Sequence, residues 1–185
     1  MFLPSDLIFT HGAGLIQRGI RWAERKPGEP EAYANHVAGF TAPEQVTEAL
    51  WSVQTRHYTT FNDGTPFQAW RCIPLTDAQR QAVATQALAY VGRDYGLFKI
   101  GAHLGDALLS RLMGRNVYAV RKLASLDRYP ICSWVWANAY GKALGEKKFF
   151  GVDANEADPD DMHDFVSAHE GVWKMVFELK GGSNA

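Results

Sequence analysis

The alternation of apolar and polar residues predicts strands in the first half of the chain and helices in the second. Short turn-rich segments containing Pro43 and Gly64 separate several of the β-prone runs, and short connections favour antiparallel pairing. A last apolar run before the polar tail predicts a strand that returns to the sheet. The runs predicted as strands are 7–10, 35–40, 46–50, 52–58, 67–73 and 172–179.

Helical spacing of apolar residues appears after the strands. Thr76 and Gln79 have the spacing of a capping box, which predicts a helix ending near Gly92. Pro130 is tolerated in a first turn, so a further helix is expected to begin near Cys132, and Asp158 is expected to cap another. Segments 15–22 and 97–113 also carry helical patterns. This order predicts an α+β fold with helices packed on one antiparallel sheet, forming a single domain over 1–180 with a flexible tail at 181–185.

Composition narrows the classes of function. The 185 residues are 46% hydrophobic and carry a formal charge of −1, which indicates a folded chain and argues against nucleic-acid binding. The N-terminus has no cationic region before its apolar residues, and no run of about 18 apolar residues occurs, so we expect no secretory signal, no membrane span and a cytoplasmic location. The two cysteines, Cys72 and Cys132, are expected to be free thiols.

Cys132 is the first candidate for chemistry. It is predicted in the first turn of an apolar helix, where the helix dipole favours a thiolate and exposed backbone N–H groups could receive an oxyanion. Taken alone, a free cysteine in an apolar segment is more often a packing residue. Cys72, within an apolar strand, is interpreted as such a packing residue.

A thiol hydrolase also needs a base, usually histidine, held by a third polar group. His36 interrupts an apolar strand and so places a titratable ring on a rigid element, although a buried structural histidine is the alternative. Glu48 lies in the next predicted strand and could reach that ring, or could simply face solvent. Glu44 precedes that strand in a predicted turn beside Pro43. The remaining histidines look less constrained and are His11, His57, His103, His163 and His169.

These residues carry a resemblance to the permuted NlpC-type papain-like hydrolases of the YiiX/YebB-like group. Segment 5–9 resembles the opening strand of that group, 35–39 its histidine strand, 46–49 the strand of its third polar residue and 129–133 its nucleophile helix. The order His, Glu, Cys is typical of the permuted group. The chain departs from the pattern at Ser5, where glycine is usual, and at Trp134, where Glu or Gln is common.

The resemblance implies a permuted papain-like fold and a cysteine amidase or peptidase, with Cys132 as nucleophile, His36 as base and Glu48 orienting His36. It also implies secondary roles near the substrate for Tyr95, in the element Gly92-Arg-Asp-Tyr-Gly96, and for Ser133. Trp134 could wall the acyl pocket or lie in the core. No metal or organic cofactor is expected. The expected substrate is a peptide, a peptidoglycan fragment or an acyl compound, while lipid acyl chemistry and a non-catalytic binding module remain alternatives, and the oligomeric state stays open.

Overall fold

The computed structural model describes residues 1–12, 32–61, 64–94 and 131–181. Within these residues the chain forms an α+β fold in which six strands make one antiparallel sheet of order β4-β3-β2-β1-β5-β6. The strands are β1 (Leu7–Thr10), β2 (His36–Ala42), β3 (Gln45–Ala49), β4 (Val53–His57), β5 (Phe67–Cys72) and β6 (Trp173–Leu179). Each predicted strand is therefore confirmed: β1 has the predicted bounds, and the other strands differ from theirs by one or two residues at one or both ends. A short 3-10 helix, Tyr58–Phe61, follows β4 and was not predicted.

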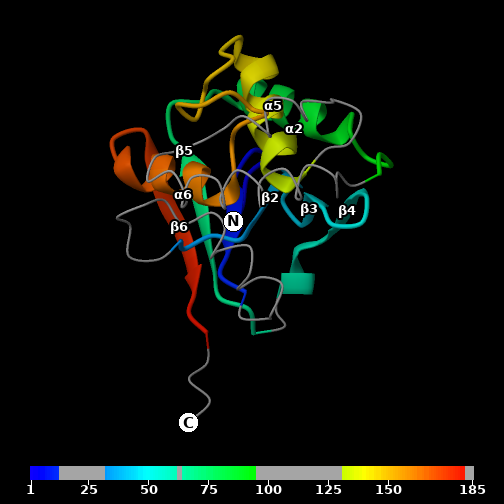
Figure 1. Cartoon of the computed structure of the whole chain (residues 1–185), viewed down its shortest axis with the longest axis vertical. Coiled ribbons are helices and arrows are strands. Elements are labelled where there is room, and N and C mark those ends of the chain that lie inside the picture. The colour runs from blue at the N-terminus through cyan, green and yellow to red at the C-terminus, as the bar shows by residue number, and fades with distance from the viewer. Residues whose placement is uncertain (13–31, 62–63, 95–130, 182–185) are drawn as a thin grey trace, which may run out of the picture.

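Three α-helices accompany the sheet in the described part of the chain: α2 (Asp77–Leu88), α5 (Cys132–Leu144) and α6 (Pro159–Ala168). The capping box predicted at Thr76 is present, and Asp158 caps α6 through a second capping box. Figure 1 shows α2 and α5 lying together over β2 and its neighbours, with α6 beside β6. The helical patterns predicted at 15–22 and 97–113 lie outside the described residues. No described helix is long and apolar enough to span a membrane.

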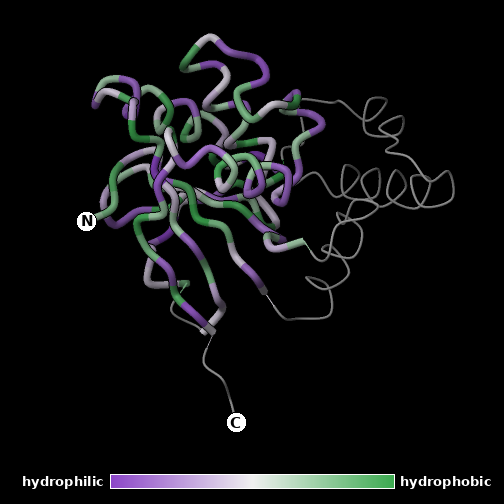
Figure 2. The backbone as a smooth tube through the Cα atoms, turned by 90° about the vertical axis from the view of Figure 1, so that its left-hand side faces the viewer, coloured by the Kyte–Doolittle hydropathy of each residue, from purple (hydrophilic) through white to green (hydrophobic). Residues whose placement is uncertain are grey.

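Strand alternation separates two apolar layers. Leu7, Phe9 and Val37 pack with residues of the three helices, whereas Ile8 and Ala38 pack in a second cluster on the opposite face of the sheet. Hydrophobic segments accordingly gather where strands and helices meet (Figure 2). The helices thus cover one face of the sheet, as predicted from the order of the elements.

Close packing fixes the position of α5 on the sheet. A Cβ atom added to Gly39 in β2 would lie 2.5 Å from Trp136 Cζ2, so the absence of a side chain allows this approach. The Trp136 indole N–H donates to the Thr47 carbonyl of β3 at 3.1 Å. Near the start of β1, Ser5 has a φ of 73°, in the left-handed region that favours glycine, and its carbonyl accepts the Tyr140 hydroxyl of α5 at 2.6 Å. These contacts set the first turn of α5 against the beginning of β2.

Candidate active site

The strand register brings His36 and Glu48 together. Glu48 in β3 lies opposite Ala38 in β2, so His36, two residues earlier on β2, is its diagonal neighbour on the same face. The Nε2 atom of His36 lies 2.8 Å from Oε2 of Glu48. The Glu48 side chain is 2% exposed and that of His36 is 17% exposed, so this pair is shielded while the ring keeps limited access to solvent.

Cys132 completes a chain of three side chains. It is the first residue of α5 and is buried at 5% exposure. Its side chain hydrogen-bonds with His36, and the backbone N–H groups of Val37 and Ser133 donate to its sulfur. Because Nε2 of His36 is engaged by Glu48, Nδ1 is the ring nitrogen left for the thiol. The three residues singled out from the sequence therefore converge, although nearly a hundred positions separate His36 from Cys132.

The electrostatics favour a thiolate beside an imidazolium. Burial raises the pKa of the Cys132 thiol, but the His36 charge, the hydrogen bond from its ring and the two backbone N–H groups together hold this pKa below its usual value. Burial alone would lower the pKa of His36. The charge and hydrogen bond of Cys132, followed by the hydrogen bond and charge of Glu48, instead raise the His36 pKa to about 10.

Arg56 is a member of the site that the sequence analysis did not single out. It lies in β4, and its Nε donates to Glu48 Oε1 at 2.6 Å while its NH2 group contacts the same oxygen. Burial raises the pKa of Glu48, but the hydrogen bond and charge of His36 and then the charge and hydrogen bond of Arg56 keep it below its usual value. Only the register between β3 and β4 places Arg56 here, because Glu48 pairs with Gln54, two residues before Arg56.

The first turn of α5 has a distinct beginning. Its N-cap residue is Ile131, which provides no side-chain cap, whereas α2 and α6 both start with capping boxes. The first backbone N–H groups of a helix have no intrahelical partner, and here the Ser133 N–H donates to the Cys132 sulfur. The dipole of α5 and these N–H groups therefore favour negative charge at the sulfur and beside it.

The secondary residues have other positions. The Ser133 hydroxyl is fully buried and donates to the Ala157 carbonyl at 2.8 Å, so it joins α5 to the segment before α6. Trp134 is 1% exposed and its indole N–H donates to Asn155 Oδ1 at 2.9 Å, which places it in the core. Tyr95 lies outside the described residues.

Cys72 and Glu44 do not belong to the group formed by His36, Glu48 and Cys132. Cys72 is 1% exposed in the helix-covered apolar core, where burial raises its pKa to about 11 despite the lowering effect of the Arg80 charge. The Glu44 side chain is 75% exposed in the turn before β3, and its Oε2 lies 3.5 Å from His57 Nε2. Within the described residues, neither side chain joins the hydrogen bonds or ion pairs of His36 and Cys132.

No protein-family model, curated protein or solved structure matches this chain.

Proposed function

We propose that the chain is a cysteine hydrolase with a permuted papain-like fold, in which Cys132 is the nucleophile, His36 the base and Glu48 the residue that orients His36. One observation carries this proposal: a continuous chain of contacts runs from the Cys132 thiol through the His36 ring to the buried Glu48 carboxylate. The thiol lies at a helix N-terminus, which is the environment that activates cysteine nucleophiles.

In the proposed first half-reaction, the Cys132 thiolate attacks the substrate carbonyl carbon and forms a C–S bond. Backbone N–H groups in the first turn of α5 stabilise the negative carbonyl oxygen. The His36 imidazolium then gives its proton to the leaving nitrogen as the C–N bond breaks, which leaves a thioester and a neutral imidazole. Glu48 keeps the ring oriented and supports its positive charge through the 2.8 Å contact.

In the second half-reaction, neutral His36 takes a proton from water, and the hydroxide oxygen attacks the thioester carbonyl. The C–S bond breaks, the carboxylic acid product leaves and loses its proton to solvent, and the thiolate–imidazolium pair is restored. No metal or redox partner takes part in either step. The proposed substrates are amide bonds of peptides or peptidoglycan-type fragments, since the resemblance to the permuted NlpC-type hydrolases implies amidase chemistry. In the alternative, the same three residues would act on esters of acyl lipids.

The test measures hydrolysis of two separate substrate sets, peptidoglycan-derived peptides and acyl esters, by wild type, Cys132→Ala and Cys72→Ala. We expect peptide cleavage by wild type and Cys72→Ala, no cleavage by Cys132→Ala, and an acyl adduct on Cys132 in mass spectra of quenched reactions. Turnover of esters alone would favour the lipid alternative. A folded, inactive Cys72→Ala beside a fully active Cys132→Ala would overturn the assignment of the nucleophile.

A further inference from the structure

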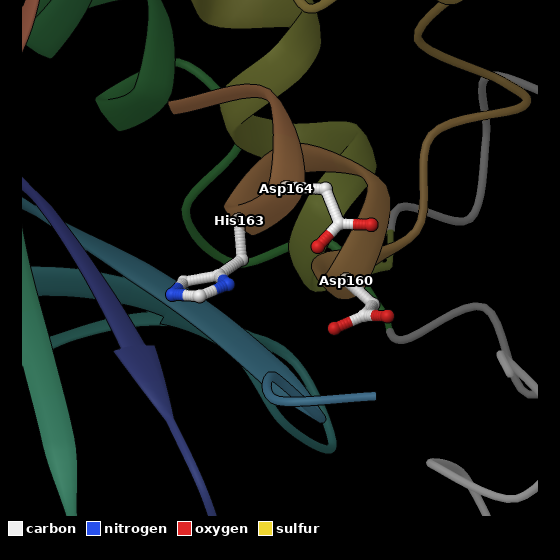
Figure 3. A group of neighbouring side chains, drawn as sticks. All are labelled: Asp160, His163 and Asp164. Carbon is white, nitrogen blue, oxygen red and sulfur yellow. The ribbon is translucent and has the colours of Figure 1, made fainter. Parts of the chain in front are cut away.

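One face of α6 carries a second group of side chains with ligand chemistry. Asp160, His163 and Asp164 occupy positions i, i+3 and i+4 of the helix, which lie on the same side. One ligand atom from each residue lies within 4.8 Å of the other two. Figure 3 shows a ring nitrogen of His163 turned toward the two carboxylates. None of these three residues is among the groups that act on the Cys132 thiol, which are His36, Val37 and Ser133.

His163 is held far more tightly than the sequence analysis expected. It is 9% exposed and its ring stacks on Tyr33 with centroids 4.4 Å apart, while Phe9 and Trp70 approach edge-on. Its Nε2 atom lies 3.0 Å from Gln68 Oε1. The ring therefore has one orientation, and its two nitrogens face different surroundings.

The hydrogen bonds fix which nitrogen of His163 carries the proton. The Trp70 indole N–H, which can only donate, lies 3.0 Å from the same Gln68 Oε1 atom, so that atom is an acceptor. The Nε2 of His163 must then donate to it, which leaves the lone pair of a neutral ring on Nδ1. Nδ1 is buried and has no hydrogen-bond partner in the described part of the chain. Buried polar atoms are usually paired, so this Nδ1 lone pair is available to a ligand.

This arrangement matches the surroundings of a metal-binding histidine. Such a histidine commonly donates its other N–H to an oxygen acceptor, as His163 does to Gln68. Asp160 is oriented in a similar way, because its Oδ1 accepts the backbone N–H groups of Tyr33 at 2.8 Å and Ala34 at 3.2 Å. A helix dipole accounts for acidic residues near the start of α6, but it does not account for the lone pair of His163.

We propose that Asp160, His163 and Asp164 bind one divalent transition-metal cation, through Nδ1 of His163 and a carboxylate oxygen of each aspartate. The mixed nitrogen and oxygen set suits ions such as Zn²⁺ and Mn²⁺. Ligand atoms within 4.8 Å need only a small adjustment to reach a common ion at about 2.0–2.2 Å, and the exposed Asp164 side chain can make it. Water completes the coordination.

The ion would have a structural role. Asp160 already holds the backbone of Tyr33 and Ala34, which lead directly into β2 and His36. A cation bound to Asp160 and His163 would hold in place the two α6 side chains that this segment contacts, Asp160 through its backbone N–H groups and His163 through the Tyr33 ring. This proposal does not depend on the hydrolase activity, and its test uses no substrate.

The experiment titrates untagged, EDTA-dialysed full-length protein with ZnCl₂ and, separately, with MnCl₂, by calorimetry and thermal denaturation. All samples carry Cys132→Ala, which removes the thiolate as a competing zinc ligand. We expect one equivalent to bind and to raise the Tm. Asp164→Asn should weaken binding by at least about tenfold. Even the loss of a residue that only hydrogen-bonds to a metal ligand typically lowers metal affinity by about 10- to 100-fold. His169→Gln, a histidine at the end of the same helix, should bind as its parent does.

A direct readout of His163 makes the test independent of any variant. Long-range ¹H–¹⁵N spectra of the histidine rings should show the Nδ1 resonance of His163 shifting on addition of Zn²⁺, while Nε2 stays protonated. If neither Zn²⁺ nor Mn²⁺ bound, the proposal would be overturned. Binding that is unchanged in Asp164→Asn, or that leaves the His163 resonance in place, would also overturn it, because the ion would then sit elsewhere on the surface.

Discussion

Alkylation of the two thiols provides a quantitative test of the candidate active site. Burial raises the pKa of Cys72 to about 11, whereas the environment of Cys132 holds its pKa below the ordinary value of 9.0. Even if Cys132 remained at 9.0, a difference of about two pKa units would give it about a hundredfold more thiolate at pH 7. A more acidic thiolate is also less nucleophilic, and over two pKa units this reduces the advantage of Cys132 by about tenfold. Cys132 should therefore react with iodoacetamide at least about tenfold faster than Cys72.

The assay follows carboxamidomethylation of the two cysteine peptides by mass spectrometry, between pH 5 and pH 10. Labelling of Cys132 should rise through a midpoint below 9, because the group whose pKa is lowered in the folded state loses its proton earlier. His36 stays protonated until about pH 10 and supports the thiolate over that interval. In His36→Gln the burial penalty on Cys132 is no longer opposed by the imidazolium, so the midpoint should move upward.

Equal and slow labelling of both thiols would refute the reasoning and would favour the binding module, because an unactivated Cys132 cannot serve as the nucleophile. A Cys132 midpoint that is the same in wild type and His36→Gln would also refute it, since the proposed activation comes from that ring. Cys72→Ala and Cys132→Ala serve as controls, each leaving one thiol to be followed alone.

Three further predictions concern the support of the site. Glu48→Gln should lower kcat but leave about a hundredfold more activity than Cys132→Ala, and Glu44→Gln should leave kcat unchanged. The kcat values are compared at matched folded concentration. An unchanged kcat in Glu48→Gln beside a reduced kcat in Glu44→Gln would assign the orienting role to Glu44. Arg56→Met should lower the free energy of unfolding by about 1–3 kcal/mol, because it leaves a buried Glu48 oxygen without its donor; urea denaturation measures it. Gly39→Ala should cost about 1–3 kcal/mol through collision with Trp136, and an unchanged Tm would contradict the packing described.

Much of the local structure was predictable because its signals are local. The capping box at Thr76 and a helix cap at Asp158 were predicted from the sequence, and alternation identified the strands; the reciprocal capping box at Asp158 was not predicted. The boundaries moved where a strand meets a turn, as at Tyr58, which begins a 3-10 helix instead of ending a strand. The role of Gly39 could not be predicted from the sequence, because a side chain at this position is excluded only by the packing of Trp136 of α5 against it.

The candidate site was predictable only in part, for a similar reason. His36, Glu48 and Cys132 were found because their residue types have distinct chemistry and occur in an informative order. Arg56 was missed because only the β3–β4 register assigns it to Glu48. His163 was missed because its isolation arises from aromatic neighbours on β1, β5 and the segment before β2, which no sequence spacing reveals.

Arg56 changes how the charges of the site balance. With a thiolate on Cys132 and a proton on His36, the charges of Cys132, His36 and Glu48 would sum to −1. This net charge would be shielded from water, since the Glu48 side chain is 2% exposed. Arg56, whose side chain is 35% exposed, adds a positive charge at the outer end, so that signs alternate from Arg56 through Glu48 and His36 to Cys132. An alternating row lets each buried charge lie beside its opposite, which offsets the desolvation that would otherwise neutralise the pair. Because Arg56 also draws on the charge of Glu48, it limits how strongly that carboxylate holds the proton on His36. In the proposed reaction, the leaving amine requires an imidazolium that can still release its proton.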